Sequence, residues 1–131
     1  MKSIKLILAA ALLPLLLVSG GCGVRDVRNI ENAAVATSSK GVALDNITKA
    51  IVRAGIALGW NMRVVKPGHI EATLYLRTHM AKVDVTYNNK DYSIKYKDSK
   101  NLDYDGTQIH SNYNGWVSNL SNGINAQLSG L

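Results

Sequence analysis

HIEATLYLRTHMAKVDVTYNNKDYSIKYK, residues 69–97, alternates apolar and polar side chains through most of its length. The apolar positions recur at every second residue in 70–76, 81–87 and 92–96. A period of two is that of a strand with one buried face. Residues 88–91, Asn-Asn-Lys-Asp, have the composition of a turn. The stretch therefore predicts three consecutive antiparallel strands.

Upstream of this stretch, residues 61–65 predict a fourth, shorter strand, joined to the next by a Pro67-Gly68 turn. Before it, apolar residues at helical spacing predict a helix in which Asp45 caps the start and Gly59 takes the left-handed position at the end. The apolar face of this helix comprises Ile47, Ile51, Ala54 and Leu58.

The C-terminal segment predicts a second helix, with Thr107 or Asp105 as its N-cap. Its polar positions are rich in Asn and Ser, which are weak helix formers, so packing must hold it. Its apolar face comprises Ile109, Tyr113, Trp116, Val117, Leu120, Ile124 and Leu128. The expected fold of residues 44–131 is a single α+β domain: helix, four-strand antiparallel meander, helix. It forms a two-layer sandwich with both helices on one sheet face.

The N-terminus has the pattern of an export signal. Lys2 and Lys5 precede an apolar run from Leu6 to Val18, followed by small residues. The run is shorter than the roughly 20 residues that a membrane-spanning helix needs. We therefore expect residues 1–21 to be a cleaved signal peptide.

Ser19-Gly20-Gly21-Cys22 resembles the lipobox of bacterial lipoproteins, although Ser19 stands where an aliphatic residue is usual. The resemblance implies an acylated Cys22 that anchors the protein in the lipid bilayer. Lipidation would also explain why an exported chain has one unpaired cysteine. Gly23, in place of Asp, implies an outer-membrane location facing the periplasm. The alternative is an ordinary signal-peptidase site and a soluble exported protein.

Residues 22–43 mix small and polar residues without a sustained period, and we expect the lipidated Cys22 to be followed by a flexible tether. At up to roughly 3.3 to 3.6 Å per residue, such a tether would hold the domain some tens of ångströms from the bilayer. The alternative is that Val24, Val27 and Ile30, spaced by three, begin a short docking helix.

Asn101, Asp103 and Asp105, followed by Gly106, match the first half of a calcium-binding loop. The bidentate glutamate that would complete the loop is replaced by Asn112. These three residues are therefore calcium candidates, and an acidic turn that caps the last helix is the alternative.

The expected sheet has one polar face, which carries acidic and basic residues. The whole chain has 15 basic and 9 acidic residues, and loss of Lys2 and Lys5 with the signal lowers its formal charge from +6 to +4. Export argues against a nucleic-acid partner, whereas an anionic envelope polymer fits this charge. The candidate contacts are Arg77, Lys82, Lys95 and Lys97, and an ordinary solvated face is the alternative.

The sequence carries none of the usual motifs for nucleophilic or nucleotide-dependent catalysis. His69, His79 and His110 lack the spacing of a zinc-binding helix, and we expect no cofactor. The aromatic residues Trp60, Tyr113 and Trp116 are expected in the core rather than at a sugar-binding surface. The leading hypothesis is a non-enzymatic envelope lipoprotein that contacts another envelope protein in an assembly or accessory role. The alternative is a ligand-binding module for calcium or an anionic polymer.

Overall fold

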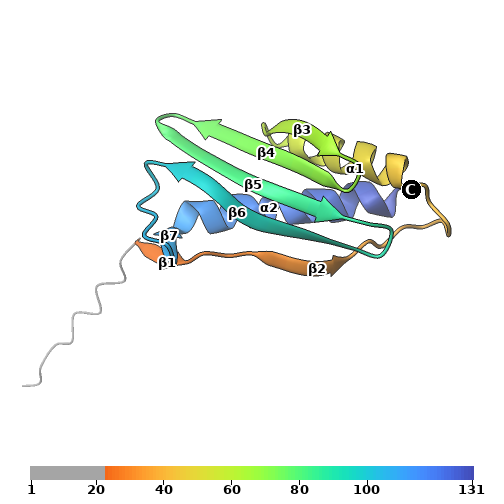
Figure 1. Ribbon diagram of the computed structural model, residues 1–131, viewed down its shortest axis with the longest axis horizontal. Helices are drawn as coiled ribbons and strands as arrows, with labels where there is room; N and C mark the ends of the chain where they lie inside the picture. The colour runs from red at the N-terminus through yellow and green to blue at the C-terminus, as the bar shows by residue number, and fades with distance from the viewer. Residues whose placement is uncertain (1–22) are drawn as a thin grey trace, which may run out of the picture.

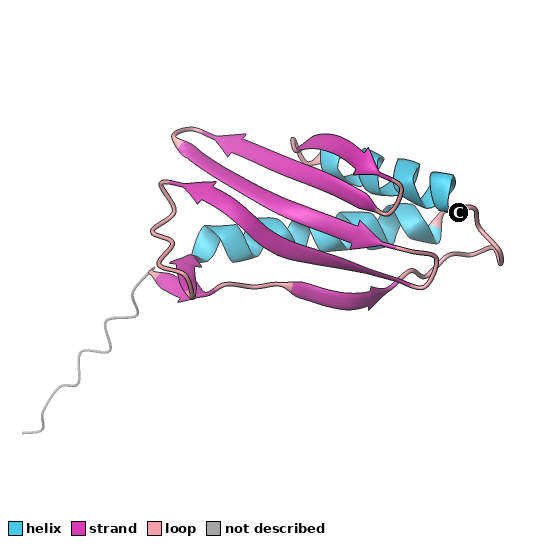
Figure 2. Ribbon diagram, in the orientation of Figure 1, coloured by secondary structure: helices cyan, strands magenta, loops and turns pink. Residues whose placement is uncertain are grey.

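The computed structural model describes residues 23–131, so the expected signal peptide and Cys22 lie outside the described residues. These residues form two helices and seven strands in an α+β fold. Figures 1 and 2 show their arrangement. No helix in residues 23–131 is long and apolar enough to cross a membrane. The elements are β1 (Val24–Asp26), β2 (Ile30–Ala34), α1 (Leu44–Ala57), β3 (Asn61–Lys66), β4 (His69–Leu76), β5 (His79–Tyr87), β6 (Asp91–Lys100), β7 (Gln108–His110) and α2 (Ser111–Ser129).

Five strands form one antiparallel sheet in the order β2-β6-β5-β4-β3, and β1 pairs with β7 in a separate two-stranded sheet. The predicted four-strand meander corresponds to β3 through β6. The expectation of four strands was nevertheless incomplete, because β2 adds a fifth strand beside β6. The alternation in residues 69–97 sets the register, in which Ile70 lies opposite Val85 and Val85 opposite Ile94 on the inner face.

Both helices lie on the same side of the five-stranded sheet in Figure 1. Most of the apolar residues expected on the helix faces are buried in one core with the inner face of the strands. The expectation was wrong for Leu58, which follows the last residue of α1 and is 42% exposed. Trp60 and Tyr113 belong to this core, and Trp116 is partly buried against it. The largest fully buried side chains are Tyr92, Tyr113, Ile47, Ile51, Ile70, Ile94, Leu102, Ile109, Leu120, Ile124, Leu128 and Val83.

The end of α1 lies where the sequence predicts it, whereas the start of the helix does not. Gly59 takes a φ of 85°, the left-handed conformation expected after the helix. The N-cap, however, is Ala43, which makes no side-chain capping hydrogen bond. Asp45 lies inside the first turn, where its carboxylate pairs with the Lys49 ammonium at 2.9 Å. The capping role expected of Asp45 was therefore wrong by two positions.

The start of α2 also differs from the prediction. Ile109 lies in β7 rather than in the helix, and His110 is the N-cap, with its Nδ1 accepting from the Asn112 amide at 3.1 Å. Asp105 and Thr107 therefore do not cap the helix. The reason is tertiary, since residues 108–110 are drawn into an extended conformation by pairing with β1.

The interpretation of residues 22–43 as a flexible tether was wrong for the part that the structure describes. Val24 pairs with His110, and Ile30 pairs with Ile94. Between the two strands, the Val27 amide donates to the Thr107 carbonyl at 2.9 Å. The domain therefore includes β1 and β2, which lie before the expected boundary at residue 44. Both strands are short and carry no period of their own.

Candidate functional site

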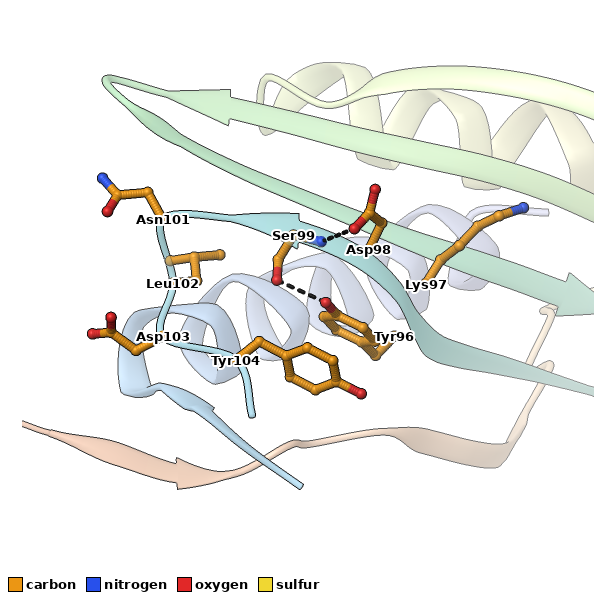
Figure 3. Close-up of a pocket in the computed structure, with 8 residues that line it drawn as sticks. All are labelled: Tyr96, Lys97, Asp98, Ser99, Asn101, Leu102, Asp103 and Tyr104. Carbon is orange, nitrogen blue, oxygen red and sulfur yellow. Dashed lines mark hydrogen bonds between the residues drawn. The ribbon is translucent and has the colours of Figure 1, made fainter. Parts of the chain in front are cut away.

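A cavity of ≈ 690 Å³ opens where β6 ends and the chain turns toward β7. Its walls come from the last part of β6 and from the loop of residues 101–104 (Figure 3). We call it the β6 cavity. Its volume falls in the range of about 300 to 1,000 Å³ typical of small-ligand clefts. The lining residues are Tyr96, Lys97, Asp98, Ser99, Asn101, Leu102, Asp103 and Tyr104.

The loop that bounds the cavity is fixed by short polar residues and by the buried Leu102. Asn101 and Asp103 have φ values of 56° and 53°, a left-handed conformation that Asn and Asp tolerate better than most residues. The Asn101 side chain donates to the Thr78 hydroxyl at 2.7 Å. The Leu102 carbonyl accepts from the His110 amide at 2.8 Å. These contacts fasten the loop to the β4–β5 turn and to β7.

Tyrosine rings form one wall of the cavity. Tyr96 and Tyr104 are stacked with their ring centroids 4.0 Å apart, and Tyr113 of α2 meets Tyr96 edge-on at 5.7 Å. The Tyr96 hydroxyl lies 2.7 Å from the Ser99 hydroxyl. Tyr104 remains 41% exposed. The wall is therefore a supported aromatic surface, one member of which is open to solvent.

Tyr113 is unusual because its hydroxyl is buried and has no hydrogen-bond partner within residues 23–131. Burial raises the pKa of Tyr113, and the nearby Tyr96 and Tyr104 raise it further. Burial likewise raises the pKa of Tyr96. Both phenols are therefore neutral at physiological pH and cannot serve as bases there.

The three calcium candidates are only partly brought together. Asn101 and Asp103 line the β6 cavity, but Asp105 does not. The Asp105 Oδ1 accepts from the amides of Gln108 at 2.7 Å and Thr107 at 2.9 Å, and these hydrogen bonds lower its pKa. In the described part of the chain, no three His, Cys, Asp or Glu side chains form a metal-binding group. Calcium binding stays a prediction.

Outside the β6 cavity, a cluster of charged side chains surrounds Glu71 on the outer face of the sheet. Its carboxylate lies 2.8 Å from the Lys97 ammonium, 3.0 Å from the Arg63 guanidinium and 3.8 Å from the Lys82 ammonium. Hydrogen bonds from Lys97 and then Arg63 are the main reasons why the pKa of Glu71 falls from 4.5 to about 2. Asp84 lies 3.4 Å from Lys97. Glu71 is therefore held ionised among three cations.

The four residues proposed for anion binding have different surroundings. Lys82 and Lys97 are engaged by Glu71, whereas Lys95 lies opposite Asp84 in the register of β5 and β6. Arg77 lies in the β4–β5 turn, beyond the end of the sheet pairing. The three lysines are thus interleaved with acids and Arg77 lies apart from them, so the four cations do not form one basic patch. Binding of an anionic polymer stays a prediction.

The tyrosine wall is not predicted by the sequence. Tyr96 is expected in a strand and Tyr104 has no expected role, because nothing in the spacing of these residues signals a stacked pair. The available signal was composition, since five aromatic or histidine residues fall between 92 and 113. The tertiary contact of Tyr96 with Tyr113, 17 positions apart, is what assembles the wall.

The β6 cavity lies at the end of the molecule where the described chain begins. The Gly23 carbonyl accepts from the Ser111 amide at 3.1 Å, and β1 pairs with β7, which follows the cavity loop (Figure 1). Residue 23, β1, β7 and the loop therefore share one end of the domain. No family model matches this chain, and no curated protein or solved structure matches it either.

Proposed function

We propose that this protein is a lipid-anchored component of the bacterial envelope that acts by contact rather than by catalysis. The anchoring part of the proposal is carried by the lipobox-like Ser19-Gly20-Gly21-Cys22. The structure adds that β1 starts at Val24, two residues after Cys22, and pairs with β7. An acyl chain on Cys22 would then hold the domain close to the bilayer. The end that carries β1, β7 and the β6 cavity would face the lipid headgroups. In this proposal the anchor lies in the outer membrane and the domain faces the periplasm.

The proposed partner is another envelope protein, and the distribution of exposed apolar side chains supports this. Of the eight large apolar residues exposed within residues 23–131, six lie between residues 56 and 76. They lie at the end of α1 or just after it, on the edge strand β3, and at the end of β4. They lie on adjoining elements, and we infer that they contribute to a contact surface, since contiguous exposed apolar area is typical of such surfaces. The six are Ile56, Leu58, Val64, Val65, Tyr75 and Leu76, and we call them the β3-edge surface.

Anchoring is tested by mass spectrometry and fractionation of the protein expressed in a bacterium that processes lipoproteins. We expect the mature N-terminus to be an acylated Cys22 and the protein to sediment with membranes. Cys22→Ser should release it into the soluble fraction, because the thiol that carries the lipid is gone. Ser19→Leu, which restores an aliphatic residue before the cysteine, is the matched control and should remain lipidated. An unmodified Cys22 in the mature wild-type protein would overturn the anchoring proposal.

The contact proposal is tested by photo-crosslinking in intact cells. A photoreactive residue at Val65 or Tyr75 should give a discrete crosslinked band that identifies one envelope protein. The same residue at Asn119, an exposed polar position on α2, is the control and should give none. Equal crosslinking from all three positions, or none from Val65 and Tyr75, would contradict a partner on the β3-edge surface.

A further inference from the structure

We propose that β3 binds its partner by strand addition, and that the added segment is an extended stretch of another protein in which apolar residues alternate with acidic ones. The inference rests on the proposed contact through the β3-edge surface. It deepens that proposal, because it states the chemistry of the partner segment and the way in which the segment pairs with the sheet.

β3 is the edge of the five-stranded sheet that is open to further pairing. In the described part of the chain its only neighbour in the sheet is β4, with which residues 61–64 pair without interruption. No backbone hydrogen bond from outside the sheet reaches β3 within residues 23–131. Every second residue of such a strand directs its amide and carbonyl away from the sheet. The opposite edge, β2, is a poorer template, because its register shifts between Ile30 and Ala33 and Asn32 has a φ of 50°.

The inner face of β3 offers an apolar site for the side chains of an added strand. Met62 lies opposite Ala72 and Val64 opposite Ile70, and both partners belong to the core. Val64 is 47% exposed and borders a cavity of ≈ 310 Å³ at the edge where α1 lies beside β3 (Figure 1). In strand addition, pockets beside the edge strand receive alternate side chains of the added segment. The cavity is lined by Leu44, Asp45, Thr48, Val64 and Pro67.

The charged side chains on the outer face of β3 are all basic. Arg63 lies opposite Glu71 and Lys66 opposite His69, and no residue of β3 is acidic. Arg63 contacts Glu71 through one nitrogen at 3.0 Å, which leaves most of its five N–H donors unused. Lys66 makes no ion pair within residues 23–131. Acidic side chains on the outer face of an added strand would therefore meet opposite charges, which stabilise a strand pair.

The same charges disfavour β3 of a second copy as the occupant of this edge. Antiparallel pairing of two such strands would bring Arg63 and Lys66 of one copy close to the same cations of the other, with no acid on either strand. Like charges that face each other across a strand pair are destabilising. Lysine on an edge strand is a common means of preventing such self-association. The chemistry of β3 therefore favours an acidic segment of a different protein.

The test is isothermal titration of the full chain, purified in a neutral detergent, with three synthetic peptides of the same length and with blocked ends. The first peptide alternates valine with glutamate, and the second alternates valine with lysine. The third is the valine–glutamate peptide with every backbone amide methylated, so that its side chains are unchanged but its backbone cannot donate hydrogen bonds. We expect only the first peptide to bind.

Hydrogen exchange locates the added strand. Binding of the valine–glutamate peptide should slow the exchange of those β3 amides that point away from β4, because they acquire hydrogen-bond partners. The amides of β2, at the other edge of the same sheet, are the internal control and should exchange as before.

Variants test the charge and the cavity separately. Lys66→Glu should weaken binding of the valine–glutamate peptide about tenfold or more, because it replaces an attraction by a repulsion. Val64→Asp should weaken it by a similar factor, because it places a charge beside the apolar cavity. Lys100→Glu changes an exposed lysine at the other end of the sheet and should have no effect. If Val64→Asp loses its thermal unfolding transition, Lys66→Glu decides the question.

Four outcomes would overturn strand addition by an acidic segment. These are no binding of the valine–glutamate peptide, equal binding of its methylated form, equal or tighter binding of the valine–lysine peptide, and unchanged exchange of the β3 amides. Sedimentation of the protein as a dimer that Lys66→Glu alters would assign the edge to a second copy and would also overturn the proposal. A discrete crosslink from Val65 alongside any of these results would leave the envelope contact in place. Peptide binding without any crosslink from Val65 or Tyr75 would support the strand site and contradict the envelope contact.

Discussion

Two buried tyrosines show how differently one residue type can contribute to stability. Tyr92 of β6 places its hydroxyl 2.7 Å from the Ser121 hydroxyl and 2.8 Å from the Asn125 amide oxygen, which joins the sheet to α2. Tyr113 is equally buried, but its hydroxyl has no partner within residues 23–131. A buried polar group contributes to stability only when it is hydrogen-bonded, and otherwise its desolvation is a cost.

We therefore expect Tyr92→Phe and Tyr113→Phe to have opposite effects. Tyr92→Phe should lower the free energy of unfolding by about 1 to 2 kcal/mol, since it leaves the buried Ser121 without its partner. Tyr113→Phe should leave stability unchanged or raise it by about 1 kcal/mol, since it removes an unpaired hydroxyl. Urea unfolding of both variants measures the difference. A loss of stability in Tyr113→Phe would show that a bound water or another group satisfies its hydroxyl.

Glu71 should make stability depend on pH in the acid range. Its pKa is lowered from 4.5 to about 2 in the folded protein by Lys97 and Arg63. A carboxyl whose pKa is lower when folded stabilises the fold above its unfolded pKa, and this contribution is lost as pH falls toward the folded value. The melting temperature should therefore fall between about pH 4.5 and pH 2.

The control compares Glu71→Gln with Glu31→Gln, which changes an exposed carboxyl on β2. Glu71→Gln should be less stable than the wild type at pH 7, and its melting temperature should decline less over the acid range. Glu31→Gln should follow the wild-type profile. Parallel profiles for the wild type and Glu71→Gln would contradict the assignment of this pH dependence to Glu71.

The elements are positioned by a few local features, of which the β3–β4 turn is the clearest. Gly68 has a φ of 85°, and a Cβ built on it would lie 2.9 Å from the Tyr87 carbonyl oxygen. That carbonyl belongs to the backbone of β5, next to the point where the Tyr87 amide donates to the Gly68 carbonyl at 2.9 Å. The turn therefore needs glycine both for its conformation and for the close approach of another strand.

Gly68→Ala tests both requirements. Gly41→Ala is the comparison, because Gly41 needs glycine only for its backbone conformation. Gly41 also has a positive φ, 66°, but nothing lies within 4 Å of a Cβ placed there. Gly41→Ala should cost about 1 kcal/mol from backbone strain alone. Gly68→Ala should cost more, because the β3–β4 turn must also move away from β5. Chemical denaturation of the two variants gives the comparison, and equal losses would mean that the Tyr87 contact adds nothing.

At the scale of the whole molecule, the first strands complete the domain although they carry little pattern of their own. β2 forms one edge of the five-stranded sheet beside β6, and Val27, Ile30, Ala33 and Val35 pack against the core. β1 holds β7 in place and thereby fixes the start of α2. Residues 23–35 are thus structural, and the distance from the proposed lipid to the domain is short.

Removal of residues 23–35 from the domain, expressed without residues 1–22, should therefore destabilise it strongly. A chain that starts at residue 36 is expected to lose several degrees of melting temperature or to be unfolded, because the edge of β6 and part of the core become exposed. Hydrogen exchange should show lost protection at the β6 amides that face β2. A chain that starts at residue 23 is the control. Equal stability of the two chains would restore the interpretation of this segment as a tether.

Local patterns in the sequence were enough to predict the alternation of β4, β5 and β6 and the buried face of α1, apart from Leu58. These patterns follow from the geometry of a single strand or helix, so they can be read from neighbouring residues. The sequence also predicted the position of Gly59 after the helix correctly, because the left-handed backbone conformation at that position favours glycine. The tertiary structure alone decided that β1 and β2 are strands, that α2 begins at Ser111 and that Tyr96, Tyr104 and Tyr113 meet. Each of these depends on partners far along the chain, as when Val24 pairs with His110, and no local period records such a partner.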